Sequence, residues 1–113
     1  MHRLFVYGTL KDDDQVRART GKTFPKTPAR LSGFRLVQSK GFYPYIVPSE
    51  ADVVEGLLLE DVDAASLRRI DEYEGEGSFY RRVAVRVSSV WGDVEAFVYV
   101  GNEHKLPLAT AGD

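Results

Sequence analysis

Short apolar stretches separated by turn-forming residues predict that most of this chain forms β-strands. The alternation is clearest towards the C-terminus, where Val83, Val85 and Val87 recur at every second position, the period of a strand with one buried face. Strands are predicted over residues 3–7, 29–38, 53–59, 81–90 and 94–100. Trp91-Gly92-Asp93 predicts a short hairpin connection between the last two. Residues 41–48, rich in aromatic residues and proline, predict a loop that runs into an edge strand.

One segment changes from the period of a strand to spacings of three residues. The apolar positions with this spacing are Ala64, Leu67, Ile70 and Tyr73. With Asp63 as N-cap and Gly75 and Gly77 as terminators, they predict an amphipathic helix that begins after Asp63. The polar segment 11–28 predicts no more than one or two helical turns.

The order of these elements lacks the strand–helix alternation of a parallel sheet, which favours an α+β fold. Gly33 and Gly56 lie inside predicted strands, where glycine is typical of a bulge or of curvature, and a closed barrel needs curved strands. We therefore expect a small, mostly antiparallel or mixed β-barrel with one main helix packed on it. The 113 residues predict a single domain over 1–113, with 102–113 as a loosely ordered tail.

Composition narrows the chemistry that this domain can perform. The absence of cysteine excludes disulfides, thiolate catalysis and zinc sites that need sulfur, and two histidines argue against a histidine-rich metal site. A net charge of −2 without a basic run argues against nucleic acid as a partner. No stretch approaches the ~18 consecutive apolar residues of a membrane span, so we expect a cytoplasmic protein without a membrane partner. Acid–base chemistry is left to carboxylates and tyrosines.

The first predicted strand ends in Tyr7-Gly8-Thr9-Leu10. A turn at this point leaves successive backbone amides free to converge on an anion, and Gly8 would let a ligand approach the backbone. An ordinary turn is the alternative interpretation, because the spacing matches neither the Walker motif nor the dinucleotide fingerprint.

Four carboxylates crowd the end of the predicted helix, within residues 70–77. Asp71 and Glu74 are three apart and would share a face, so a carboxylate there beside Tyr73 could be partly buried. Burial would raise its pKa and suit it to general acid–base catalysis, whereas a solvated acidic loop is the alternative. The tyrosines that could line a pocket with it are Tyr7, Tyr43, Tyr45, Tyr73, Tyr80 and Tyr99. Arg81 and Arg82 could pair with the acidic cluster or bind a substrate carboxylate.

A set of short motifs ties these features together. In chain order they are FVYGTL at 5–10, GFYP at 41–44, VEG at 54–56, IDEYEG at 70–75 followed by YRR at 80–82, and FVY at 97–99. This pattern resembles the gamma-glutamylcyclotransferase-like family, above all its gamma-glutamylamine cyclotransferase branch and its small bacterial and archaeal members. The resemblance implies a small β-barrel with helices packed on it, and a reaction in which a γ-glutamyl compound closes on itself to release 5-oxoproline and an amine or amino acid.

The resemblance also implies roles for particular residues. Glu74 matches the catalytic glutamate, with Glu72 as the alternative base. The residues that match the loop holding the glutamyl end are Tyr7, Gly8, Thr9 and Leu10. The weaker matches, as pocket walls, are Tyr43, Pro44, Tyr80 and Tyr99. The implied reaction needs no metal, thiol or cofactor, and its partner is a small γ-glutamyl substrate.

Two other functions remain open at this point. The same barrel could bind a small carboxylate through the Tyr7–Leu10 amides without catalysis, or it could be a nucleic-acid or protein-interaction barrel. The sequence does not indicate the leaving group, the oligomeric state or the pathway.

Overall fold

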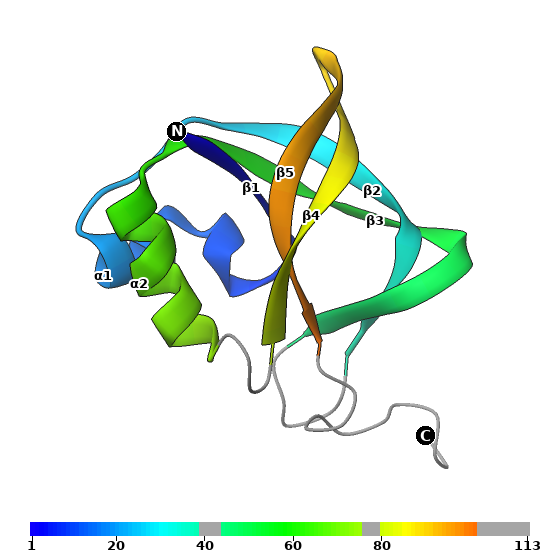
Figure 1. Cartoon of the computed structure of the whole chain (residues 1–113), viewed down its shortest axis with the longest axis horizontal. Helices are drawn as coiled ribbons and strands as arrows, with labels where there is room; N and C mark the ends of the chain where they lie inside the picture. Colours follow the sequence, from blue (N-terminus) through cyan, green and yellow to red (C-terminus); the bar gives the residue numbers. More distant parts are fainter. Residues whose placement is uncertain (39–43, 76–79, 102–113) are drawn as a thin grey trace.

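The computed structural model describes residues 1–38, 44–75 and 80–101, and in them five strands close into a barrel (Figure 1). The strands are β1 (His2–Val6), β2 (Lys26–Val37), β3 (Tyr45–Val62), β4 (Tyr80–Ser89) and β5 (Gly92–Gly101). Their order around the barrel is β1-β3-β2-β4-β5. The β1–β5 pair, which joins Leu4 to Phe97, is parallel, and the other pairs are antiparallel. The predicted mixed barrel is therefore confirmed.

The prediction for residues 41–48 agrees with the part that the structure describes, since Pro44 lies outside any strand and residues 45–48 pair with β2 alone. Residues 45–48 open the 18-residue strand β3, which pairs with β2 and, in its later part from Leu57 to Val62, also with β1. Proline fits here because the β2–β3 register shifts between Ser32 and Phe34, and Pro48 lies opposite Phe34 just past that shift. Gly33 lies at the shift with a φ of +88°, so the predicted bulge at this glycine is confirmed.

Gly56 serves a different purpose from Gly33. A Cβ atom at this position would lie 2.3 Å from the carbonyl oxygen of Val6 and 2.9 Å from the Phe5 ring, closer than side chains approach. The absence of a side chain therefore lets β1 cross close to β3, just before β1 ends at the turn that follows Val6.

The predicted helix is confirmed as α2 (Ala64–Glu74). The Asp63 side chain accepts a hydrogen bond from the Ser66 amide at 3.1 Å, and Gly75 ends the helix in the left-handed conformation. A second helix, α1 (Asp13–Thr20), follows a short 3₁₀ turn, η1 (Thr9–Lys11), and provides the two turns that the polar segment allowed. Both α-helices lie together on one side of the barrel (Figure 1).

Two apolar clusters hold these layers together. The cluster inside the barrel comes from the strands and includes Phe5, Leu31, Ile46, Leu58, Val87 and Val98. The other joins the helices to β1 and β3 and includes Leu4, Val6, Leu10, Val16, Leu67 and Ile70. Because neighbours on a strand face opposite ways, β1 contributes Phe5 to one cluster and Leu4 and Val6 to the other. None of the described helices is long and apolar enough to cross a membrane. The predicted tail at 102–113 lies outside the described residues.

Candidate active site

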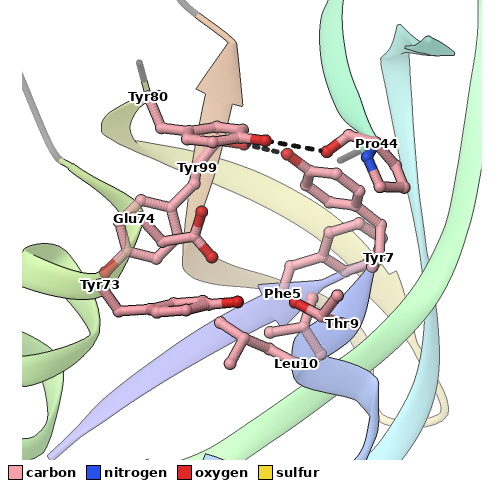
Figure 2. Close-up of a pocket in the computed structure, with 11 residues that line it drawn as sticks. Phe5, Tyr7, Thr9, Leu10, Pro44, Tyr73, Glu74, Tyr80 and Tyr99 are labelled. Carbon is pink, nitrogen blue, oxygen red and sulfur yellow. Dashed lines mark hydrogen bonds between the residues drawn. The ribbon is translucent and has the colours of Figure 1, made fainter. Parts of the chain in front are cut away.

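A cavity of about 300 Å³ lies between the end of β1 and the last turn of α2 (Figure 2), at the lower end of the range typical of small-ligand sites. Its lining residues are Phe5, Val6, Tyr7, Gly8, Thr9, Leu10, Pro44, Tyr73, Glu74, Tyr80 and Tyr99. The structure therefore brings together Glu74, the Tyr7–Leu10 turn, Pro44, Tyr80 and Tyr99, as the motif resemblance implied, whereas Tyr43 lies outside the described residues.

The lining differs from the predicted set in a few positions. Phe5 and Val6 were not expected in it, although their place at the end of the first strand was a usable signal. Tyr45 was one of the candidate pocket tyrosines, but it is 2% exposed in the core and does not line the cavity. Tyr73 does line it, as its inward helical position suggested.

The residues of the turn after β1 line one side of the cavity. Lys11 and Asp12 donate their amides to the carbonyls of Gly8 and Thr9, at 3.0 and 3.2 Å. The amides at positions 8 to 10 precede the first of these bonds and have no partner within the short helix. A Cβ atom on Gly8 would lie 3.9 Å from Pro44, another lining residue, so a side chain there would take up space at the cavity. The turn thus exposes backbone where a ligand can reach it.

Glu74, the last residue of α2, carries its carboxylate into the cavity (Figure 2). Among the described residues it has no hydrogen bond or ion pair. Burial raises its pKa from 4.5 to about 7, and the positive charge of Arg19 opposes part of that increase. A carboxylate with this pKa exists in both protonation states near neutral pH, as general acid–base catalysis requires. Glu72, the alternative base, is exposed and does not line the cavity.

Asp71 shares a helix face with Glu74, yet its surroundings differ. Its Oδ1 accepts hydrogen bonds from the Tyr99 hydroxyl at 2.6 Å and from Arg82 Nε at 2.9 Å. This carboxylate therefore joins α2 to β4 and β5, and Arg82 pairs with the acidic cluster, which was one of its two expected roles. Of the two carboxylates predicted on this face, one anchors the helix and the other remains open to a ligand.

Tyrosine hydroxyls close the far side of the cavity. Tyr7 donates to the carbonyl of Tyr99 at 2.7 Å, and Tyr80 donates to the carbonyl of Pro44 at 3.1 Å (Figure 2). Burial holds the pKa of Tyr7 well above its usual range, with Tyr80 and Glu74 raising it further. Burial and Asp71 raise the pKa of Tyr99 in the same way. Both phenols thus stay neutral at physiological pH, and Glu74 is the ionisable group poised to exchange protons. No group of three or more histidines or carboxylates that could hold a metal occurs within 1–38, 44–75 and 80–101.

Known proteins share this sequence pattern. A protein-family model described as gamma-glutamyl cyclotransferase, AIG2-like, matches residues 4–113. AIG2-like protein A of Arabidopsis thaliana is 38% identical over 88 residues, which cover 77% of this chain and 52% of that protein. Protein AIG2 C of the same plant is 33% identical over 107 residues, 90% of this chain and 64% of that protein. The chain therefore spans between about half and two thirds of the length of these relatives.

Solved structures share the fold. An Arabidopsis thaliana protein solved in solution superposes with a TM-score of 0.84 at 31% identity, over 96% of this chain and 66% of that one. A gamma-glutamyl cyclotransferase superposes with a TM-score of 0.75 at 22% identity, over 89% of this chain and 66% of that one, which shows the shared fold alone. Since the family match extends from residue 4 to the last residue, this chain belongs to the AIG2-like gamma-glutamyl cyclotransferase family, as the resemblance of its motifs predicted.

Proposed function

We propose that this protein converts a γ-glutamyl compound to 5-oxoproline and a free amine or amino acid, with Glu74 as general base and then general acid. The observation that carries the proposal is an unpaired carboxylate with a pKa of about 7 in the same cavity as the Tyr7–Leu10 turn. Membership of a family that includes gamma-glutamyl cyclotransferases supports the reaction class.

The reaction suits a site with so few polar groups. The α-amine of the glutamyl group attacks its own γ-carbonyl carbon, so nucleophile and electrophile are already tethered and positioning supplies much of the rate. Glu74 takes a proton from the α-ammonium group, the ring C–N bond forms, and the bond to the leaving nitrogen breaks. Glu74 gives that proton to the leaving nitrogen as this bond breaks, and the restored carboxylate then takes the second proton from the ring nitrogen and passes it to the released amine.

The Tyr7–Leu10 turn supplies the other requirement of this mechanism. Amides from the turn would hold the substrate carboxylate or the oxyanion that develops on the γ-carbonyl, the second being worth more to catalysis. Tyrosine and phenylalanine rings around them exclude water, which strengthens these contacts.

The test is release of 5-oxoproline from a panel of γ-glutamyl amino acids and γ-glutamyl amines. We expect turnover by the parent protein and a loss of about 10²–10⁴-fold in kcat for Glu74→Gln, the usual contribution of a positioned acid–base group. Glu72→Gln is the matched control, because this exposed neighbour should change the rate less than about twofold.

Two outcomes would contradict the proposal. Unchanged turnover in Glu74→Gln would remove Glu74 from the mechanism. Saturable binding of glutamate-like ligands without any product across the panel would instead support the non-catalytic carboxylate-binding barrel.

A further inference from the structure

Arg19, in the last turn of α1, lies beside the cavity without lining it. Its guanidinium carbon is 3.8 Å from the centroid of the Tyr73 ring, and Tyr73 is part of the cavity wall. The positive charge of Arg19 also lowers the pKa of Glu74, the residue that follows Tyr73 in α2. A cation thus stands close to the carboxylate that the proposed mechanism uses.

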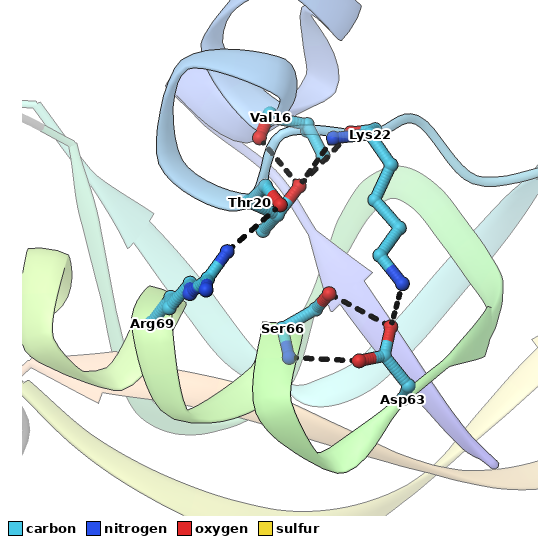
Figure 3. A network of polar contacts seen from close by, with 6 residues as sticks. All are labelled: Val16, Thr20, Lys22, Asp63, Ser66 and Arg69. Atoms are coloured by element: carbon cyan, nitrogen blue, oxygen red, sulfur yellow. Dashed lines mark hydrogen bonds and ion pairs between the residues drawn. The ribbon is translucent and has the colours of Figure 1, made fainter.

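The fold fixes the turn of chain that carries this arginine. Arg69 Nη1 donates to the carbonyl of Thr20 at 3.2 Å, and Lys22 Nζ pairs with Asp63 at 3.0 Å (Figure 3). Both contacts join the end of α1 to α2, and Arg69 lies one helical turn before Tyr73. Arg19 is therefore held against Tyr73 by a built interface between the helices.

Arg19 also lacks the partner that other arginines near it have. Arg17 on the same helix pairs with Asp14 at 3.1 Å, and Arg82 pairs with Asp71 at 2.9 Å. Arg19 has no ion pair among the described residues, and its buried Nε has no hydrogen-bond partner there. The positive charge of Arg19 in the last turn of α1 interacts favourably with the helix dipole. This interaction does not require any of the N–H donors of the guanidinium. No described residue that lines the cavity is a cation, so Arg19, packed on the cavity wall at Tyr73, is the described cation whose charge acts on Glu74.

We propose that Arg19 binds a carboxylate on the leaving part of the substrate, so that the enzyme prefers γ-glutamyl amino acids to γ-glutamyl alkylamines. This inference rests on the proposed function. There the glutamyl end is held by the turn after β1, and Glu74 must reach the leaving nitrogen to protonate it. A group that lies next to Glu74 on the α2 side therefore faces the leaving part. In a γ-glutamyl amino acid the second carboxylate is separated from that nitrogen by a single carbon.

The test compares two substrates that differ only in this carboxylate, γ-glutamyl-alanine and γ-glutamyl-ethylamine. A charge-assisted hydrogen bond predicts that the parent protein favours the alanine compound by about 10- to 100-fold in kcat/KM. Arg19→Gln should bring this ratio close to one, and Arg19→Lys should keep part of it. Removing Arg19 also changes the pKa of Glu74, but that effect is shared by both substrates and cancels in the ratio.

Arg17→Gln is the matched control, since it removes an exposed arginine from the same helix and should leave the ratio unchanged. A parent ratio near one, or a ratio that Arg19→Gln leaves intact, would overturn the inference while the proposed function stands. If neither compound yields 5-oxoproline, the proposed function fails. In that case the dissociation constants of the same two compounds are measured by calorimetry. Tighter binding of the alanine compound by tenfold or more, lost in Arg19→Gln, would support carboxylate binding by Arg19, and equal binding of the two compounds would contradict it.

Discussion

Two cavities lie at the opposite ends of β1, and a carboxylate in one of them, Glu60, has an ion-pair partner that Glu74 in the other lacks among the described residues. The cavity at the start of the strand is larger, about 430 Å³, and its charged lining residues include Arg3, Glu60, Asp61 and Glu95. There Arg3 Nε pairs with Glu60 at 2.9 Å. The cavity at the end of the strand, about 300 Å³, has apolar and tyrosine walls and one carboxylate, Glu74, that no described residue pairs.

The difference teaches that cavity size is a poor guide to chemistry in this molecule. A carboxylate paired with an arginine has its negative charge compensated by the guanidinium, so the pair contributes to structure. A carboxylate buried without a partner is destabilised in its ionised form, and it relieves that cost by taking up a proton. The smaller cavity therefore has the group that can exchange a proton with a ligand near neutral pH.

The largest expected effect that separates the two cavities is on stability. Because burial raises the pKa of Glu74, the folded state binds more protons than the unfolded state between about pH 4.5 and 7, and stability should fall as the pH rises through that window. Glu74→Gln should therefore raise the free energy of unfolding by about 3 kcal/mol at pH 8 and by little at pH 4. Urea unfolding at the two pH values measures this.

Glu60→Gln is the counterpart in the other cavity. It removes a partly exposed ion pair, so at pH 8 it should lower stability, by no more than about 1 kcal/mol. The proposed difference between the two cavities would be contradicted if Glu60→Gln raised the free energy of unfolding at pH 8. It would also be contradicted if Glu74→Gln did not raise it.

A smaller effect is expected at the anchor beside the active cavity. Asp71→Asn keeps the shape of the side chain but removes the negative charge that pairs with the half-buried Arg82, which should cost about 2 kcal/mol of unfolding free energy. Looser attachment of the last turn of α2 should also lower kcat several-fold while the acid limb of the pH profile keeps its midpoint. A midpoint that moved with Asp71→Asn would make Asp71 part of the proton-transfer machinery instead.

The smallest effect should come from the cavity wall. Tyr7→Phe removes the hydroxyl that donates to the Tyr99 carbonyl, and one such bond contributes about 1 kcal/mol to stability. Turnover should fall only a few-fold, because this phenol stays neutral and holds the wall in place. A loss as large as that of Glu74→Gln would give Tyr7 a direct part in the chemistry.

Local signals in the sequence predicted the parts of this site that depend on neighbours along the chain. The turn after residue 7, the helix between Asp63 and Gly75, and the inward face of that helix follow from capping and periodicity. The motif resemblance then indicated which acidic residue to follow, because Asp71, Glu72 and Glu74 could not be ranked by spacing alone.

Features that depend on distant segments could not be predicted in the same way. Pro44 and Pro48 suggested a loop that runs into an edge strand, whereas the length of β3 depends on its pairing with β2, which reaches back to Tyr45. Asp71 became an anchor only because β4 and β5 bring Arg82 and Tyr99 to it. The position of Arg19 beside Tyr73 could not be predicted from the polar segment that contains it, because it depends on how α1 packs against α2.

The pH dependence of kcat/KM for 5-oxoproline release tests the central claim most directly, because it measures the ionisation of the free enzyme during its proposed reaction. Glu74 must be ionised to accept the first proton, so kcat/KM should fall about tenfold per pH unit below a midpoint near pH 7. A profile that stays flat down to pH 5 would contradict the account, because Glu74 would then not be the buried base that the cavity holds.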